Sequence, residues 1–181
     1  MVILDVLDNY DVRLIRLSRE KIEMIRNWRN DPKISSYMEY REIITTEMQV
    51  KWFESINNNE NLYYIIEFKG EEIGLINIKD IDNESKSGES GVFMYSDKYL
   101  NSDISYRAHL CLFDYYFQAL GYNELHAHVL ESNKRASRLS EFLGFNRIDG
   151  TNYSVHREEY LSNHNRIRFI KKYMLLKKKK Q

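Results

Sequence analysis

The stretch ELHAHVLESNKRASRLSEFLGF, residues 124–145, changes its hydrophobic period halfway along. Leu125, Ala127 and Val129 alternate with polar residues, which predicts a strand over residues 124–130. The apolar residues that follow recur at helical spacing. Gly144 can end that helix in a left-handed conformation, and Phe145 can then fold back over it. The stretch therefore predicts a strand followed directly by a helix.

The N-terminal part predicts one strand and two helices. Residues 12–17 alternate apolar side chains with arginine, as a strand does. A helix opens near Ser18 and ends at Asp31, because the residue before a proline avoids helical geometry. Thr45 or Thr46 caps a second helix that runs to about Ile56.

The middle of the chain predicts three strands and a helix. Residues 62–68 and 72–78 are β runs joined as a hairpin through Lys69-Gly70-Glu71, and residues 90–95 form a further strand. The clearest helix covers residues 105–120, where apolar residues recur three and four positions apart.

The C-terminal part predicts a long closing hairpin made of residues 153–161 and 167–176. Residues 177–181 are lysine-rich and predict a disordered, solvated tail. The whole order predicts one α/β (α+β) domain, residues 1–181, with a mixed central sheet of about seven strands and helices on both faces.

The composition excludes several classes of protein. The 27 basic and 27 acidic residues balance, so no overall field favours nucleic acid or a membrane. A single cysteine permits no intrachain disulfide. The start of the chain lacks the features of a signal peptide, and no apolar run approaches the ~20 residues of a membrane span. These features predict a soluble cytoplasmic protein that binds neither nucleic acid nor a membrane.

The order of elements, together with residues 123–145, resembles the GNAT superfamily of N-acetyltransferases over about residues 12–176. The resemblance implies an acyltransferase that moves acetyl from acetyl-CoA, as co-substrate, to a primary amine. Within the superfamily, NWRNDPKISSYM (residues 27–38) and ITTEMQVKWFESI (residues 44–56) are similar to nucleotide-sugar acetyltransferases of the pseudaminic-acid type. Those enzymes acetylate the 4-amino group of a UDP-linked amino sugar.

This similarity implies a UDP- or dTDP-linked amino-deoxy sugar of surface-glycan biosynthesis as acceptor. Two alternatives stay open. Ribosomal-protein N-terminal acetyltransferases share the general plan and a C-terminal hairpin, so a protein N-terminus or peptide amine is the second acceptor class. The third alternative is a catalytically quiet binding module with the same fold. Dimerisation is common among such relatives, so a homodimer is compatible with the resemblance.

The family holds the coenzyme A pyrophosphate in a glycine-rich turn before a helix, which corresponds here to residues 99–106. The glycines are missing, and Asp103 and Ser105 stand where two of them would be. Asp103 could itself cap the helix, and its charge would repel a pyrophosphate. The family also splays the two strands beside this turn to admit the pantetheine arm. The cofactor contacts implied are Phe93, Met94, Ser102, Asp103, Ile104, Ser105, Tyr106 and Asn133.

Acetyl transfer to an amine requires a neutral amine, a polarised thioester and a protonated leaving thiolate. His128 stands where several family members carry a basic carboxylate, and a histidine pKa near ~6.5 suits that task. His126 shares its strand face, and Glu89 is a third candidate. Ser140 occupies the place of the tyrosine that commonly donates the proton to the thiolate.

Substrate contacts are expected in the first two helices and the loop between them. An arginine beside aromatic rings suits a nucleotide diphosphate, although tryptophans at helical spacing fit a core face equally well. The expected contacts are Trp28, Arg29, Met38, Tyr40 and Trp52. The five histidines are scattered, so no metal site is predicted.

Overall fold

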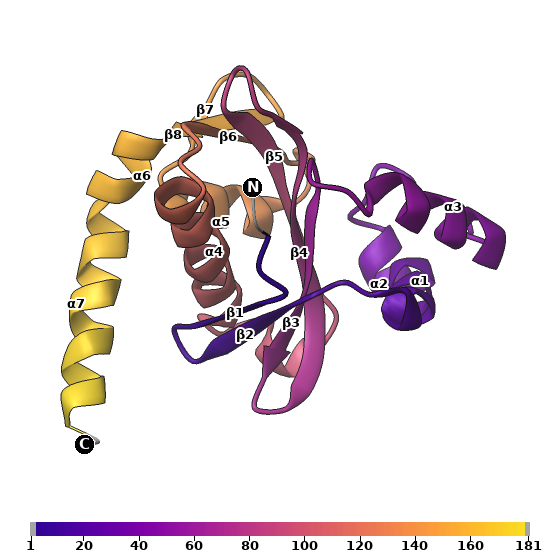
Figure 1. Ribbon diagram of the computed structural model, residues 1–181, viewed down its shortest axis with the longest axis horizontal. Coiled ribbons are helices and arrows are strands. Elements are labelled where there is room, and N and C mark those ends of the chain that lie inside the picture. Colours follow the sequence, from indigo (N-terminus) through magenta and orange to yellow (C-terminus); the bar gives the residue numbers. More distant parts are fainter. Residues whose placement is uncertain (1–2, 180–181) are drawn as a thin grey trace.

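Strand β3 (Leu62–Phe68) is buried on both of its faces in the computed structural model, which describes residues 3–179. Leu62, Tyr64 and Ile66 pack into one core cluster, whereas Tyr63 and Ile65 pack into a second. This division follows from the alternation of side chains along a strand. A continuous apolar run therefore requires helices on both faces, and Figure 1 shows a helical layer on each side of the sheet.

The sheet has eight strands in the order β1-β2-β3-β4-β5-β6-β8-β7. All neighbouring pairs are antiparallel except β5 and β6, which are parallel. The mixed sheet is confirmed, with one strand more than expected. The strands are β1 (Val6–Asn9), β2 (Val12–Arg16), β3, β4 (Glu71–Asp82), β5 (Ser87–Met94), β6 (Glu124–His128), β7 (Asn146–Arg147) and β8 (Asn152–His156).

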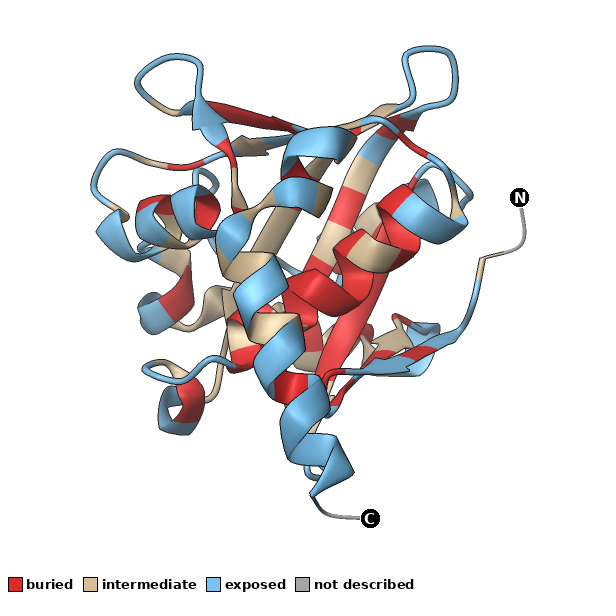
Figure 2. Cartoon of the chain, turned by 90° about the vertical axis from the view of Figure 1, so that its left-hand side faces the viewer, coloured by how far each residue is buried: buried red, intermediate tan, exposed pale blue. Residues whose placement is uncertain are grey.

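The helices form two groups. On one face lie α1 (Ile22–Asn30), α2 (Pro32–Ser35) and α3 (Thr46–Ile56); on the other lie α4 (Ile104–Asp114), its π-helical continuation η3 (Tyr115–Ala119), α5 (Lys134–Leu143), α6 (Arg157–Ser162) and α7 (His164–Lys178). Two short 3-10 turns are η1 (Arg19–Lys21) and η2 (Asp97–Tyr99). Figure 2 shows that α4 is largely buried beneath α7, whose own outer surface is exposed.

Several helix ends follow directly from local sequence. The Thr45 hydroxyl caps α3 by accepting a hydrogen bond from the Met48 amide (3.3 Å). At the end of α5, Gly144 has φ +99°, and the Gly144 and Phe145 amides donate to the carbonyls of Glu141 and Ser140. This is the predicted Schellman ending, and it confirms the strand-to-helix reading of residues 124–145.

Two expectations about the chain ends were wrong. Strand β1 was missed because its two-residue turn to β2 contains no glycine: Tyr10 and Asp11 have φ 55° and 58°. The Tyr10 ring packs against Phe169 and Tyr173, and its hydroxyl donates to Asp114 (2.5 Å), so tertiary contacts stabilise the left-handed turn.

The predicted closing hairpin is instead a strand followed by two helices, β8, α6 and α7. The Asn163 side chain starts α7 by accepting a hydrogen bond from the Arg166 amide (2.9 Å). Lys177 and Lys178 continue that helix instead of starting a disordered tail, and the end of the predicted tail, residues 180–181, lies outside the described residues.

A buried polar cluster joins α4, α6, α7 and the first hairpin. Asp114 accepts hydrogen bonds from the hydroxyls of Tyr10 and Tyr160 (2.8 Å) and from the Arg166 guanidinium (2.8 Å). The side chains of Asp114 and Arg166 are only 15% and 12% exposed. Burial, reinforced by Asp114, raises the pKa of Tyr10.

We expect Asp114→Ala to lower the free energy of unfolding by about 3 kcal/mol, because it leaves the Arg166 charge buried without a partner. Urea denaturation followed by circular dichroism measures the change. Glu54→Ala is the control, because the Arg19–Glu54 pair is mostly exposed and should contribute about 0.5 kcal/mol or less. Equal losses in the two variants would contradict a structural role for the cluster.

Candidate functional site

Strands β5 and β6 pair only at one end and then separate. Their parallel register covers Ser87 to Glu89 against Glu124 to His126. Beyond that point β5 pairs with β4 and β6 pairs with β8. Within residues 3–179, no strand pairs with the second edge of β5 from Ser90 to Met94. Backbone groups on that edge are therefore available to a ligand.

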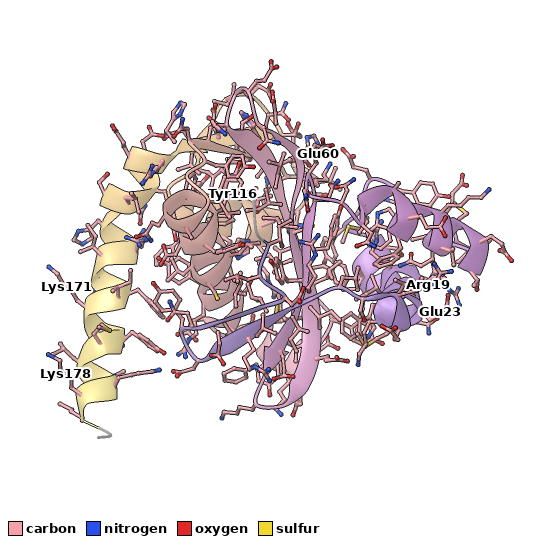
Figure 3. All side chains as sticks on the ribbon, viewed as in Figure 1. Arg19, Glu23, Glu60, Tyr116, Lys171 and Lys178 are labelled. Atoms are coloured by element: carbon pink, nitrogen blue, oxygen red, sulfur yellow. The ribbon has the colours of Figure 1, made fainter. Side chains whose placement is uncertain are left out.

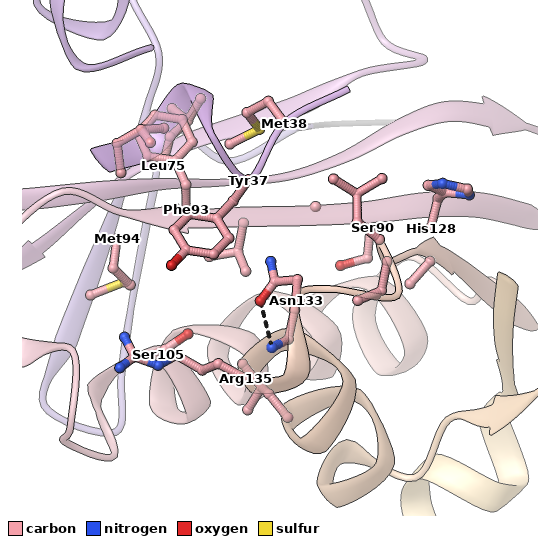
Figure 4. A pocket seen from close by; sticks show the side chains of 18 of the residues that line it. Tyr37, Met38, Leu75, Ser90, Phe93, Met94, Ser105, His128, Asn133 and Arg135 are labelled. Atoms are coloured by element: carbon pink, nitrogen blue, oxygen red, sulfur yellow. Dashed lines mark hydrogen bonds between the residues drawn. The ribbon is translucent and has the colours of Figure 1, made fainter. Parts of the chain in front are cut away.

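A cavity of about 980 Å³ opens at this separation. It is bounded by β4, β5 and β6, by the α2 region, and by α4 and α5. In Figure 4, His128 lies toward one end of the cavity and Met94 and Ser105 toward the other. Asn133 lies between them, and its side-chain oxygen accepts a hydrogen bond from the Ala136 amide (3.1 Å) as the cap of α5.

The cavity brings together most of the residues predicted from sequence. Those in its wall are Arg29, Met38, Tyr40, Trp52, Glu89, Phe93, Met94, Ser105, His128, Asn133 and Ser140. Six others are not part of the wall: Trp28, Ser102, Asp103, Ile104, Tyr106 and the second candidate base, His126. Trp28 is buried in the core and stacks on Tyr95, with ring centroids 5.0 Å apart.

The glycine-free turn before α4 directs its acidic side chain away from the helix terminus. The Asp103 carboxylate makes no capping hydrogen bond and instead pairs with Arg107 (2.9 Å) one turn along the helix. The Ile104 amide donates to the Ser102 hydroxyl (3.3 Å). Asp103 therefore does not cap α4, and the positive charge of Arg107 offsets its negative charge.

Both ring nitrogens of His128 face oxygen acceptors. Nδ1 lies 3.0 Å from Asn152 Oδ1, and Nε2 lies 2.9 Å from Glu39 Oε1. The Asn152 side-chain nitrogen donates to Asp149, which leaves its oxygen for His128. This arrangement is satisfied when both nitrogens carry protons. The Nε2 of His128 can accept a proton from a ligand only when Glu39, whose side chain is 72% exposed, no longer contacts it.

All three carboxylates of the cavity wall lie beside a basic side chain. Glu39 pairs with His128, and Glu89 with Lys79 (3.1 Å). Asp97 pairs with Lys33 (3.4 Å). Glu89 lies within β5 and not in a loop before it, as the sequence suggested. Burial alone would lower the pKa of Lys79, but Glu89 and Asp80 raise it overall.

Arg29 is a cation of the wall with no such partner. Its Nε is buried and makes no hydrogen bond, and no acidic residue within residues 3–179 pairs with it. Burial lowers the pKa of its guanidinium, which remains charged at neutral pH. The aromatic side chains of Tyr63 and Trp52 also line this part of the cavity and contact each other edge to face.

Residues 11–146 match the family model described as an acetyltransferase (GNAT) domain. The chain belongs to this family. Its members use acetyl-CoA. The protein is therefore an acyltransferase. The open edge of β5 lies within the matched residues 11–146.

Some known proteins resemble this GNAT enzyme in sequence and others in fold. Two proteins named Acetyltransferase PseH, from Campylobacter jejuni strains of serotypes O:2 and O:23/36, are 28% and 27% identical over 68% of this chain and 75% of their own length. A Vibrio cholerae spermidine N-acetyltransferase solved with CoA and spermine superposes with TM-score 0.74 (20% identity, 85% of this chain, 100% of that chain). A Methanocaldococcus jannaschii domain superposes with TM-score 0.69 (21% identity, 80% and 97%).

Several wall residues of the acetyltransferase had no signal in the sequence. They are Lys33, Tyr37, Glu39, Tyr63, Lys79, His109, Lys134 and Arg135. Lys134 and Arg135 directly follow the predicted Asn133, so their position at a helix start could have been noticed. No described helix is long and apolar enough to cross a bilayer, and the described residues contain no group of three side chains suited to a metal ion.

His109 of α4 is a buried histidine of the cavity wall. Its Nδ1 lies 2.7 Å from the Ser105 carbonyl, to which the neutral imidazole can donate. Burial lowers the pKa of His109 to about 4. The imidazole is therefore neutral near pH 7, and its Nε2 can act as an acceptor but not as a donor.

This histidine makes stability depend on pH in a defined direction. The unfolded chain binds a proton at His109 below about pH 6.5, whereas the folded chain resists protonation until about pH 4. The free energy of unfolding should thus fall as pH drops through this window, by about 2 kcal/mol between pH 7 and 5. Denaturation of His109→Gln at several pH values should show no such fall in the free energy of unfolding. The control His164→Gln, at an exposed position, should show the same fall as the unaltered protein. Identical pH profiles would contradict the assignment.

Proposed function

We propose that this acetyltransferase moves acetyl from acetyl-CoA to the amino group of a nucleotide-linked amino sugar, UDP- or dTDP-linked. The observation that carries the proposal is the unpaired Arg29 guanidinium in a cavity where Glu89 and Asp97 are paired with lysines. A nucleotide diphosphate offers phosphate oxygens that an arginine can bind in pairs. The base can stack on aromatic residues such as Trp52 and Tyr63.

The charge of the wall argues against a polyamine acceptor. A polycation is bound by free carboxylates, but two of the three wall carboxylates, Glu89 and Asp97, are already paired with lysines. The spermidine enzyme is similar in fold alone, at 20% identity. The curated relatives named PseH support a sugar acceptor of the pseudaminic-acid type. The closing hairpin that would have favoured a ribosomal-protein type is replaced by α6 and α7.

The residues present fit acetyl-CoA. Backbone groups of β5 from Ser90 to Met94 have no strand partner on the cavity side, so a pantetheine amide chain could pair with them. Ser105 at the start of α4 and the cations Lys134 and Arg135 suit the phosphates. The positive charge of Arg107 offsets the negative charge of Asp103, which would otherwise repel the phosphates. When bound, acetyl-CoA supplies an activated acetyl thioester.

We assign the remaining roles to residues of the wall. His128 takes the proton of the acceptor amine once Glu39 has moved aside, because a neutral imidazole then has a free lone pair. Ser140 is a buried hydroxyl of α5 beside the cavity and relays a proton from water to the thiolate, giving up one proton as it accepts another. Glu89 is held by Lys79 and contributes charge balance.

The acceptor is tested by incubating the protein and acetyl-CoA with UDP- and dTDP-amino sugars, spermidine and an N-terminal peptide, with mass spectrometry of each mixture. We expect acetylation of a nucleotide sugar and a higher rate than with spermidine. Arg29→Gln should raise KM for that sugar about 30-fold, equivalent to about 2 kcal/mol of charge-assisted hydrogen bonding, and leave KM for acetyl-CoA unchanged.

Arg19→Gln is the matched control, because Arg19 is exposed outside the cavity and should leave both constants unchanged. Acetylation of spermidine alone, or an Arg29→Gln variant with unaltered KM for the sugar, would contradict the proposed acceptor. A peptide product would establish the second acceptor class. No turnover and no acetyl-CoA binding would indicate a quiet binding module.

The turn before α4 makes a separate prediction. Arg107→Gln leaves the Asp103 carboxylate uncompensated near the phosphates, and a cost of about 1 kcal/mol should raise the Kd of acetyl-CoA about fivefold. Adding Asp103→Asn to that variant should restore the original Kd. Isothermal titration calorimetry measures all three proteins. If the double variant binds as weakly as Arg107→Gln, Arg107 acts in some way other than by balancing Asp103.

A further inference from the structure

The balanced charge of this protein is strongly segregated along the chain. Eight of the 27 basic residues follow Glu159, and none of the 27 acidic residues does. Residues 1–159 therefore contain 19 basic and 27 acidic residues, for a formal charge of −8, whereas residues 160–181 carry +8. A net charge of zero conceals this asymmetry, and the basic part coincides with α7.

The cations of α7 are mostly unpaired and face away from the body of the protein. Arg166 pairs with Asp114, and Lys177 lies 3.6 Å from Asp11. The others have no ion-pair partner within residues 3–179: Arg168, Lys171, Lys172, Lys178 and Lys179. Figure 3 labels Lys171 and Lys178 on the side of α7 that is turned away from the sheet.

The same exposed surface carries large apolar side chains. Met174 and Leu175 are 55% and 63% exposed, and Leu176 and Ile167 are also exposed. Only Tyr173 of α7 is buried, while Phe169 and Ile170 are partly buried against the core. We define the outer face of α7 as Ile167, Arg168, Lys171, Lys172, Met174, Leu175, Leu176, Lys178 and Lys179. The outer face therefore combines a cluster of cations, which an anionic lipid surface attracts, with apolar side chains exposed to water.

We propose that the outer face of α7 binds the surface of an anionic lipid bilayer. The lysines and arginine provide attraction to anionic headgroups, and Met174 and Leu175 enter the boundary between headgroups and acyl chains. The net charge of −8 on the rest of the chain is repelled from the same surface, which orients the protein with α7 toward the lipid.

Charge complementarity favours lipid over other occupants. Pairing the outer face with that of a second copy would bring two clusters of like charge together. Nucleic acid would satisfy the cations but offers no environment for exposed leucine and methionine side chains. The cavity contains no residue of α7, so the proposal is independent of the acceptor of acetyl transfer.

Cosedimentation of the full chain with vesicles tests the proposal. One set of vesicles contains phosphatidylcholine with about 25% phosphatidylglycerol, and the other contains phosphatidylcholine alone. We expect the fraction of protein bound to be at least tenfold higher on the first set. Binding should weaken as salt rises from 0.1 to 0.5 M, because the Debye length falls below ~10 Å. Lys171→Gln/Lys172→Gln/Lys178→Gln should lose most binding. The variant Met174→Ser/Leu175→Ser should lose the part of the vesicle binding that persists at high salt.

The matched control is Lys51→Gln/Lys86→Gln/Arg138→Gln, which removes the same charge from exposed positions outside α7 and should bind like the unaltered protein. Near-ultraviolet circular dichroism verifies that each variant is folded, and turnover in vesicle-free solution should be unchanged in all of them. Equal binding to both vesicle types, or binding to neither, overturns the proposal. Dimerisation in analytical ultracentrifugation that the α7 variants abolish, or RNA binding without vesicle binding, also overturns it.

Discussion

The separation of β5 from β6 is the feature on which the site depends. Two parallel strands that pair over three residues and then diverge leave one edge of β5 unpaired inside the molecule. An unpaired strand edge is costly to bury without a partner and is normally covered. In this GNAT enzyme α4 and α5 flank the gap instead of closing it, so the edge lines a cavity. The neighbouring elements position their side chains around that opening.

The charged side chains around the opening are unevenly paired. Glu89 and Asp97 are paired with lysines of the wall, whereas Arg29 has no ion-pair partner among residues 3–179. A guanidinium buried in this way is expensive unless a ligand supplies the missing acceptors. This unpaired cation is the basis of the proposed nucleotide-linked acceptor, which the fold alone does not specify.

The enzyme also consists of two regions that differ in net charge. The sheet and its first helices are acidic overall, and α7 is basic with apolar side chains on its exposed side. The contacts of Tyr10, Tyr160 and Arg166 with Asp114 hold α7 onto that body. Only the inner side of α7 contacts the core and contributes to stability. Its outer side carries the exposed cations and apolar side chains.

The sequence by itself determined the elements whose signals are local. The strand and helix of residues 124–145, the Thr45 cap and the Gly144 ending were predictable, because caps and periodicity involve neighbouring residues only. Tertiary structure decided the rest. The turn at Tyr10 and Asp11 needs the packing of Tyr10, and α7 needs Asn163 together with the contacts of Phe169 and Tyr173, although its residues also suit a strand. The pairing of Glu39 with His128 and the exclusion of Trp28 from the cavity depend on which side chains converge in space, which spacing along the chain does not encode.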